Sequence, residues 1–128
     1  MTYIHIEGEI HSSKNSRRVL RTWSGRTIVA KSKQSKADES ILEAQLLAQM
    51  DEWKNGIESE PFPLKVKFYF YRQTRRRWDF MNIAQGVADA MVKAGYIPDD
   101  DVEHFIPVYA GHEVCKDAPG VDFWISHD

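Results

Sequence analysis

The chain has 128 residues, of which 42% are hydrophobic and 28% charged, so we expect one folded domain covering residues 1–128 and exclude intrinsic disorder. Its one cysteine, Cys115, excludes an internal disulfide. No apolar run approaches the roughly 20 residues of a membrane span, and none resembles a signal peptide. We therefore expect a cytoplasmic protein with no membrane contact. A formal net charge of −2 does not exclude a nucleic-acid partner, because 14 of the 17 basic residues lie in two segments, 14–36 and 65–77, that contain no acidic residue.

The first part of the chain predicts three short strands and a basic loop. Tyr3–Glu7 alternates apolar and polar residues, which is the period of a half-buried strand. His11–Arg18 is rich in serine, asparagine and basic residues and is typical of an exposed loop. Val19–Trp23 and Thr27–Ala30 are predicted to pair as a hairpin that turns at Ser24-Gly25.

A long helix is predicted from about Lys36 to Trp53, and Asn55-Gly56 supplies its stop signal. Helical spacing gives this segment one apolar stripe, formed by Ile41, Leu42, Leu46, Leu47, Met50 and Trp53. We expect the stripe to face the core, so the helix serves packing rather than chemistry.

Leu64–Tyr71 is the clearest strand in the sequence. Its alternation predicts a buried face made of Leu64, Val66, Phe68 and Phe70. The opposite face carries Lys65, Lys67, Tyr69 and Tyr71. That face could track a phosphate backbone, although a solvated lysine face with aromatic cross-strand pairs is the commoner situation.

A second helix is predicted over Phe80–Ala94, with an apolar stripe formed by Phe80, Ile83, Val87, Ala90, Met91 and Ala94. Asp79 stands where an N-cap belongs, and Gly95 stands where a C-cap glycine belongs. Val102–Tyr109 and Val121–Ile125 are predicted as closing strands joined by a loop. The order β, β, β, α, β, α, β, β predicts an α/β (α+β) fold with one mixed β-sheet and two main helices.

Basic and acidic residues meet at the start of this second helix. Arg75–Arg77 stand just before Asp79, and another acidic run, Asp99–Asp101, follows the helix. Carboxylate oxygens are the ligands that Mg²⁺ prefers, and basic side chains can hold a polyanion beside them. The pattern indicates a metal-dependent nuclease if the loop after the helix folds back, because 15 helical residues span about 22 Å. Read separately, Asp79 is an N-cap, the aspartate run a solvated turn and the arginines a solubilising loop, and these alternatives stay open.

The segment from Arg75 to Asp101 resembles the central signature of the RusA-type Holliday junction resolvases. Its residues are Arg-Arg-Arg-Trp-Asp-Phe-Met-Asn at 75–82, then Gln85, Asp89-Ala90-Met91, Lys93-Ala94-Gly95-Tyr96 and Asp99-Asp100. In that family an arginine-rich loop precedes Asp-x-Asp-Asn, and a lysine, an Asp-Ala-Leu and a late Asp-Asp pair follow. The N-terminal basic segment resembles the family more loosely, at Lys14–Arg18 and Gly25-Arg26.

The resemblance implies a Mg²⁺-dependent homodimeric endonuclease, often carried by prophages, that resolves four-way DNA junctions in recombination and repair. It implies that Asp79 and Asp100 are catalytic and that Asp79, Asp99 and Asp100 bind the metal. Asn82 and Asp89 match the asparagine and the mid-helix aspartate of the family. The phosphate contacts are expected from six basic residues, Lys14, Arg17, Arg18, Arg75, Arg76 and Arg77.

Two positions depart from the family pattern. Met81 stands where the family has its second aspartate, and Gln85 stands where it has its catalytic lysine. A thioether is a poor Mg²⁺ ligand, and an amide cannot supply the positive charge that stabilises an oxyanion. Asp99, Asp101 or Glu103 could replace the missing ligand. The alternatives are a catalytically weak or inactive relative that binds branched DNA, and a scaffold whose segregated charge serves protein partners.

Other chemistry has little support in the sequence. His104, His112 and Cys115 form a loose cluster of zinc-binding residue types, but their spacing matches no common zinc signature. The glycines are scattered, so no phosphate-binding loop for a nucleotide cofactor is predicted.

Overall fold

The structure is a computed structural model that describes residues 3–11, 17–21, 27–31 and 33–127, with the side chains of 3–11 and 38–127. One sheet has the strand order β1-β6-β4-β5, formed by β1 (Tyr3–Glu7), β6 (Gly120–Ile125), β4 (Leu64–Arg72) and β5 (Phe105–Val114). β6 is antiparallel to both β1 and β4, whereas β4 and β5 are parallel. The sheet is therefore mixed, as the sequence predicts.

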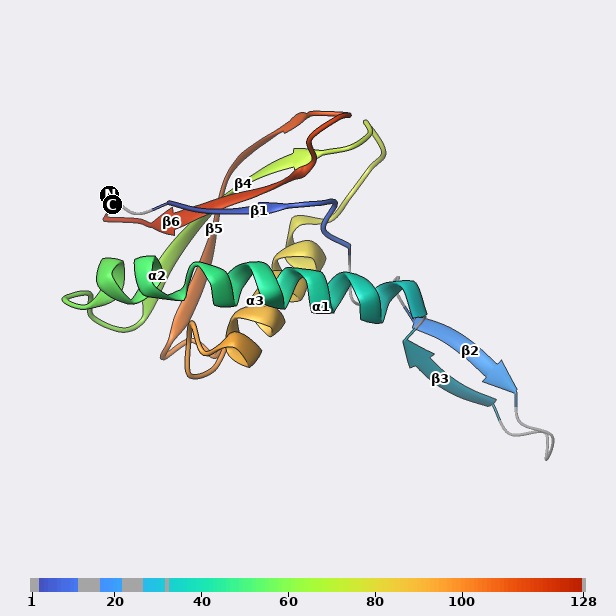
Figure 1. The fold of residues 1–128 in the computed structure, drawn as a ribbon, viewed down its shortest axis with the longest axis horizontal. Helices are drawn as coiled ribbons and strands as arrows, with labels where there is room; N and C mark the ends of the chain where they lie inside the picture. The colour runs from blue at the N-terminus through green and yellow to red at the C-terminus, as the bar shows by residue number, and fades with distance from the viewer. Residues whose placement is uncertain (1–2, 12–16, 22–26, 32, 128) are drawn as a thin grey trace.

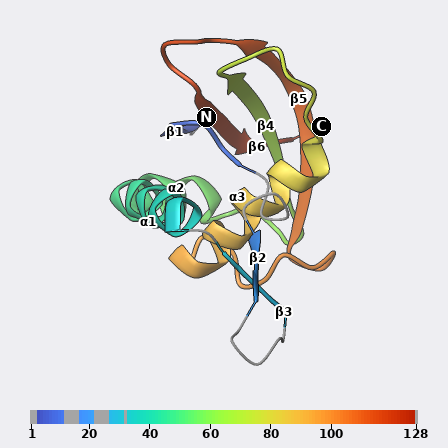
Figure 2. The ribbon, with the colours of Figure 1, turned by 90° about the vertical axis from the view of Figure 1, so that its right-hand side faces the viewer.

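Helices cover one face of this sheet (Figures 1 and 2). They are α1 (Lys33–Ala48), α2 (Met50–Ile57) and α3 (Phe80–Ala94). α3 forms the crossover that two parallel neighbours such as β4 and β5 require. Helices packed on a mixed sheet confirm the predicted α+β class, with three helices in the described chain where two main ones were expected.

The core lies between the sheet and the helices, and β4 runs through its centre. Leu64, Val66, Phe68 and Phe70 are at most 1% exposed, as their alternation predicts. Burying a side chain of this kind stabilises the fold by roughly 1.5–3 kcal/mol. β4 therefore anchors the sheet, and the loop that follows it starts from a fixed position.

α3 begins and ends where the sequence predicts. Asp79 has extended backbone angles, and its side chain accepts a hydrogen bond from the Met81 backbone nitrogen. Gly95 has φ of 88°, a left-handed conformation that glycine adopts without strain. The predicted apolar stripe is buried, except that Phe80 at its start is only half-buried. Both caps fix the register of the helix that carries the candidate site.

The single long helix predicted from Lys36 to Trp53 is wrong. α1 already begins at Lys33, and α2 continues to Ile57, past the predicted stop at Asn55-Gly56. The two helices are separated at Gln49, whose side-chain amide accepts from the His5 backbone nitrogen and donates to the His5 carbonyl oxygen. A contact with β1, distant in sequence, therefore accompanies the break, and the helical period alone does not reveal it.

The break also changes which side chains of the predicted stripe are buried. Leu42, Leu46 and Trp53 are buried as expected, but Ile41 and Leu47 are 58% and 53% exposed. The indole nitrogen of Trp53 donates to the Tyr96 carbonyl oxygen at 2.9 Å, and the two rings stack with centroids 5.1 Å apart. α2 thus packs against the chain just after α3.

The strand predicted over Val102–Tyr109 is displaced. β5 starts only at Phe105, because the backbone nitrogens of His104 and Phe105 both donate to the Asp101 carbonyl in a turn. β5 then continues to Val114, through part of the loop expected after Tyr109. The register with β4 shifts once, where Phe68 pairs with Tyr109 and Tyr69 with Gly111, so Ala110 forms a bulge.

The basic N-terminal region forms a separate two-stranded sheet. β2 (Arg17–Arg21) and β3 (Thr27–Lys31) pair antiparallel, as predicted, and extend away from the four-stranded sheet (Figure 1). Arg17 and Arg18 therefore belong to a strand and not to the loop predicted over His11–Arg18. Residues 12–16 of that loop and the predicted turn at Ser24-Gly25 lie outside the described residues.

Candidate active site

Two carboxylates meet beside α3 at the side chain of Gln85. The Gln85 amide nitrogen donates to Asp100 Oδ2 at 2.6 Å and to Asp89 Oδ1 at 2.8 Å. Asp89 lies one turn after Gln85 on the same helix face, whereas Asp100 comes from the loop after α3. The loop therefore folds back along the helix, which was the condition for a site shared between the two acidic regions.

Asp79 lies at the start of the same helix, and both of its carboxylate oxygens have protein partners. Oδ1 accepts from the Met81 backbone nitrogen at 2.9 Å, and Oδ2 accepts from the Asn82 amide at 3.2 Å. Gln85 is six positions after Asp79, which is about 9 Å along a helix axis. The N-cap role of Asp79 is confirmed, and Asp79 precedes Gln85 by between one and two helical turns.

The two positions that depart from the family pattern are neighbours on α3. Met81 and Gln85 are four residues apart, so their side chains lie on one face, and Asp89 continues the same row. Met81 is 66% exposed, and Gln85 and Asp89 are also exposed. A neutral thioether and a neutral amide therefore occupy the solvent-facing row that leads to Asp100.

The remaining aspartates of the run at 99–101 have local roles. Asp99 Oδ1 accepts from the Asp100 backbone nitrogen at 2.8 Å, and Asp101 pairs with the His104 ring. No group of three or more His, Cys, Asp or Glu side chains is close enough to hold a metal ion within the described part of the chain. The structure brings Asp89 and Asp100 together but does not bring Asp79, Asp99 and Asp100 to one point.

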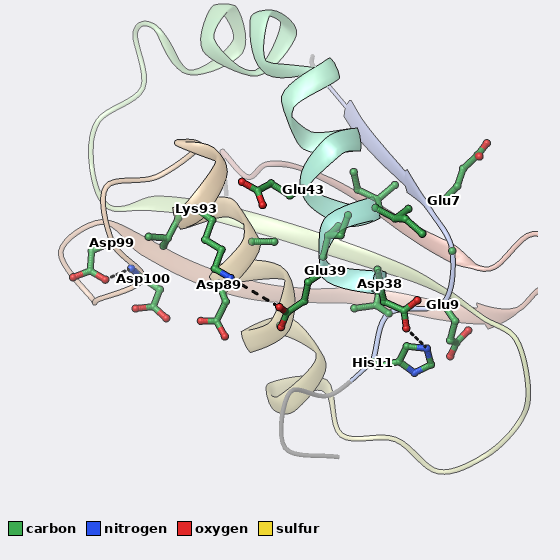
Figure 3. A pocket seen from close by; sticks show the side chains of 18 residues that line it. Glu7, Glu9, His11, Asp38, Glu39, Glu43, Asp89, Lys93, Asp99 and Asp100 are labelled. Carbon is green, nitrogen blue, oxygen red and sulfur yellow. Dashed lines mark hydrogen bonds and ion pairs between the residues drawn. The ribbon is translucent and has the colours of Figure 1, made fainter. Parts of the chain in front are cut away.

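A groove of about 640 Å³ adjoins these residues between α1, α3 and the chain after β1. Figure 3 shows Asp89, Asp99 and Asp100 gathered near one end and His11 and Asp38 near the other. Eight carboxylates line the groove: Glu7, Glu9, Asp38, Glu39, Glu43, Asp89, Asp99 and Asp100. Lys93 pairs with Glu39 at 3.9 Å and His11 with Asp38 at 3.6 Å. Such an acidic lining repels a polyanion.

The arginine side is the loop between β4 and α3. Arg75, Arg76 and Arg77 are all exposed. Arg72 at the end of β4 is different, because its side chain is only 13% exposed and pairs with Glu9 at 2.8 Å. Burial lowers the pKa of Arg72, and the Glu9 carboxylate opposes that effect. Arg72 thus fixes the start of the loop, whereas Arg75, Arg76 and Arg77 remain exposed to solvent.

Trp78 connects this loop to the core. Its ring lies 4.9 Å from the Arg72 guanidinium and 5.1 Å from the Phe70 ring centroid, and it is half-buried. These contacts pack Trp78 against the core. The other predicted phosphate ligands cannot be placed: Lys14 and the side chains of Arg17 and Arg18 lie outside the described residues.

Two residues that lie near the start of α3 are not predicted from the sequence to belong to the candidate site. Tyr109 and His112 of β5 both contact Trp78, at 6.4 Å and 5.2 Å between ring centroids. The sequence indicates His112 only as a zinc-binding residue type and Tyr109 only as the end of a predicted strand. The bulge at Ala110 puts these two residues on the same face although they are three positions apart, and no sequence pattern predicts this bulge.

Comparison with known proteins adds no family assignment: no family model matches the chain, and no curated protein matches it. The resemblance to the junction resolvases therefore depends on the residues of the motif alone. In the part of the chain that the structure describes, no helix is long and apolar enough to cross a membrane.

Proposed function

We propose that the protein is a structure-selective, Mg²⁺-dependent DNA endonuclease of the RusA type. Its substrate would be the four-way Holliday junction formed in recombination and repair, and it would act as a cytoplasmic homodimer, because symmetric cleavage of a junction needs two active sites. The alternating basic and acidic segments of residues 14–101 supply the two kinds of group that such chemistry requires.

The contact between Gln85 and Asp100 carries this proposal. It returns the loop after α3 to the helix that Asp79 caps, so carboxylates from two sequence regions lie along one element. The exposed loop of Arg75–Arg77 immediately precedes that element. An acidic site flanked by phosphate-binding arginines is what hydrolysis of a phosphodiester needs, because the substrate is anionic and the metal must be held by hard ligands.

The donor set fits Mg²⁺ in part. Mg²⁺ is usually held by one or two carboxylates together with waters and substrate phosphates, so three converging protein ligands are not required. Asp79, Asp99 and Asp100 are the candidate ligands. Because they do not converge on one point, one or two of them would hold the ion together with water and substrate phosphate, and the bound ion would polarise the phosphoryl oxygen and activate water. Asp79 and Asp100 are the proposed catalytic carboxylates. Met81 adds no ligand, so the affinity for Mg²⁺ should be low compared with a site of three carboxylates.

The six basic residues would hold the DNA backbone. Arg75, Arg76 and Arg77 lie beside Asp79 along the chain, and Lys14, Arg17 and Arg18 belong to the basic N-terminal region. Contacts of this kind bind phosphate without reading sequence, and they release counterions. Affinity should therefore fall steeply as salt increases.

A second candidate is a catalytically weak or inactive relative that still binds branched DNA. One observation favours it: the Gln85 amide nitrogen stands between Asp89 and Asp100, so a neutral hydrogen-bond donor holds the two carboxylates where a lysine would bring charge. The phosphate-binding arginines do not depend on that position. Binding could therefore survive where cleavage does not.

One experiment separates the two candidates. The purified protein and an Asp79→Asn variant are incubated with a synthetic four-way junction and Mg²⁺, beside a duplex of the same sequence. Cleavage by the parent and not by the variant supports the nuclease. Junction binding by both proteins without cleavage supports the inactive relative. Equal affinity for junction and duplex would overturn both.

A further inference from the structure

Tyr109 and His112 of β5 form a partly exposed aromatic pair, which we call the Tyr109–His112 platform. Tyr109 is 46% exposed, and His112 is also exposed. The Tyr109 hydroxyl and His112 Nδ1 form a hydrogen bond, and the ring centroids lie 5.9 Å apart. An exposed aromatic pair with a fixed mutual orientation is available to stack with another ring.

The platform lies directly beside Asp79. Phe80, the residue after Asp79, meets the Tyr109 ring edge-on at 5.2 Å. Trp78, the residue before Asp79, meets the His112 ring edge-on at 5.2 Å. Both flanking residues of the proposed catalytic carboxylate thus touch the platform, and the exposed arginine loop ends at Trp78.

The backbone of β5 holds the platform in place. The bulge at Ala110 puts Tyr109 and His112 on the same face although they are three residues apart. Gly111 has φ of 130°, and a Cβ there would lie 2.9 Å from the Tyr69 ring. A side chain at position 111 would be strained in both respects, so the bulge depends on this glycine. A pre-organised ring loses little conformational entropy when a ligand stacks on it.

We propose that the Tyr109–His112 platform stacks with a DNA base that is unpaired at the branch point. Proteins bind single-stranded nucleic acid by combining cationic groups that hold phosphates with aromatic rings that stack on bases. Here Arg75–Arg77, in the loop that ends at Trp78, supply the cations, and Tyr109 with His112, which contact Trp78, supply the rings. A continuous duplex keeps its bases stacked inside and cannot reach the platform. The platform therefore adds affinity only for DNA with an opened base, which deepens the proposed function and rests on it.

The test uses a four-way junction with 2-aminopurine at the branch point, because the fluorescence of this base reports its stacking. Tyr109→Leu removes the aromatic face while keeping an apolar side chain against Phe80, and Tyr109→Phe keeps the ring without the hydroxyl. Tyr3→Leu is the matched control, because Tyr3 is 58% exposed and contacts Trp124 on β6, away from the platform. Thermal melting of each variant verifies folding.

Loss of one stacked base should weaken junction binding by Tyr109→Leu about five- to a hundredfold, with little change for duplex DNA. The 2-aminopurine signal should change on binding of the parent, Tyr109→Phe and Tyr3→Leu, but not of Tyr109→Leu. Equal losses for junction and duplex, or an unchanged signal with Tyr109→Leu, would overturn the platform. Cleavage is scored separately from binding. If the parent cleaves the junction and Tyr109→Leu binds it as tightly as the parent does, the platform is disproved and the proposed function is not. A parent that binds no DNA disproves both proposals.

Discussion

The Gln85 side chain donates to the Asp100 carboxylate at 2.6 Å and so ties the loop after α3 to the second turn of that helix. The same nitrogen also bonds Asp89, so one neutral amide joins two carboxylates. Under the proposed function, this neutral amide stands where the resembled family has a lysine, whose positive charge would stabilise the transition state.

Gln85→Lys should therefore raise junction cleavage. A lysine ammonium can pair with both Asp89 and Asp100 and can also face a phosphate oxygen, and we expect an increase in kcat of about tenfold or more. Single-turnover cleavage at saturating protein measures it. Gln73→Lys is the control, because it adds the same charge on the exposed loop beyond β4. If both variants gain equally, the effect is general attraction of DNA and not chemistry at Asp100.

Asp79 has two separable roles, as helix cap and as proposed ligand. Asparagine is as good an N-cap as aspartate, whereas alanine is not, so Asp79→Ala should lose about 1 kcal/mol of unfolding free energy and Asp79→Asn much less. Both variants lack the carboxylate and should both lose cleavage. Denaturant unfolding and junction cleavage are measured on the same samples. A stable Asp79→Asn variant that cleaves like the parent would leave Asp79 with its cap role only.

Local patterns predicted the elements whose burial follows a simple period. β4 and α3, with the caps Asp79 and Gly95, agree with the sequence because their apolar positions face one core and their ends have standard signals. The same patterns placed Asp79 at a helix start next to an exposed arginine loop. That part of the candidate site could be predicted.

Contacts between distant segments could not be predicted. The break at Gln49 accompanies its hydrogen bonds to β1, and Gln85 joins Asp89 to Asp100 only because the loop after α3 folds back. The bulge that pairs Tyr109 with His112 depends on registry between β4 and β5. Each of these contacts depends on tertiary structure, which the hydrophobic periodicity of one segment does not predict.

Gln45 and Gln49 protect the edge of the sheet. Each amide accepts from and donates to one β1 residue: Gln45 pairs with Glu7, and Gln49 pairs with His5. Because each of these four hydrogen bonds contributes about 0.5–1.5 kcal/mol, the Gln45→Ala/Gln49→Ala double variant should lose roughly 2–6 kcal/mol. It should also self-associate, because an uncovered edge can pair with another strand.

Denaturant unfolding and analytical ultracentrifugation measure these two effects. Leu47→Ala, at a position that is 53% exposed on α1 between the two glutamines, controls for the change in helix propensity. A double variant as stable and as monodisperse as Leu47→Ala would mean that the two glutamines do not protect the edge.

Stability should fall at alkaline pH through Tyr71. Its hydroxyl donates to Asp122 at 2.8 Å, and this hydrogen bond, with burial, raises the pKa of Tyr71 to about 12. The folded state therefore favours the protonated hydroxyl. This contribution is complete below pH 10, the ordinary pKa of tyrosine, and is lost as the pH rises toward 12.

Tyr71→Phe should flatten the decrease of unfolding free energy between pH 10 and 12, measured by denaturant titration at each pH. Burial also raises the pKa of Tyr96, so part of the decrease should remain. Tyr3→Phe is the control for loss of an exposed hydroxyl. A decrease in Tyr71→Phe as steep as in the parent would show that the bond to Asp122 does not couple to folding.

Under the proposed function, Asp100, which Gln85 holds beside α3, takes part in metal-dependent cleavage of branched DNA. The most direct measurement is nicking of an end-labelled four-way junction by the parent and by Asp100→Asn, with Mg²⁺ and with a chelator, at protein concentrations that saturate binding. We predict paired nicks near the branch point from the parent in Mg²⁺ only, and intact junction bound by Asp100→Asn. Parent protein that saturates the junction in Mg²⁺ and leaves it uncut, or Asp100→Asn that cuts at the parent's rate, would contradict the claim.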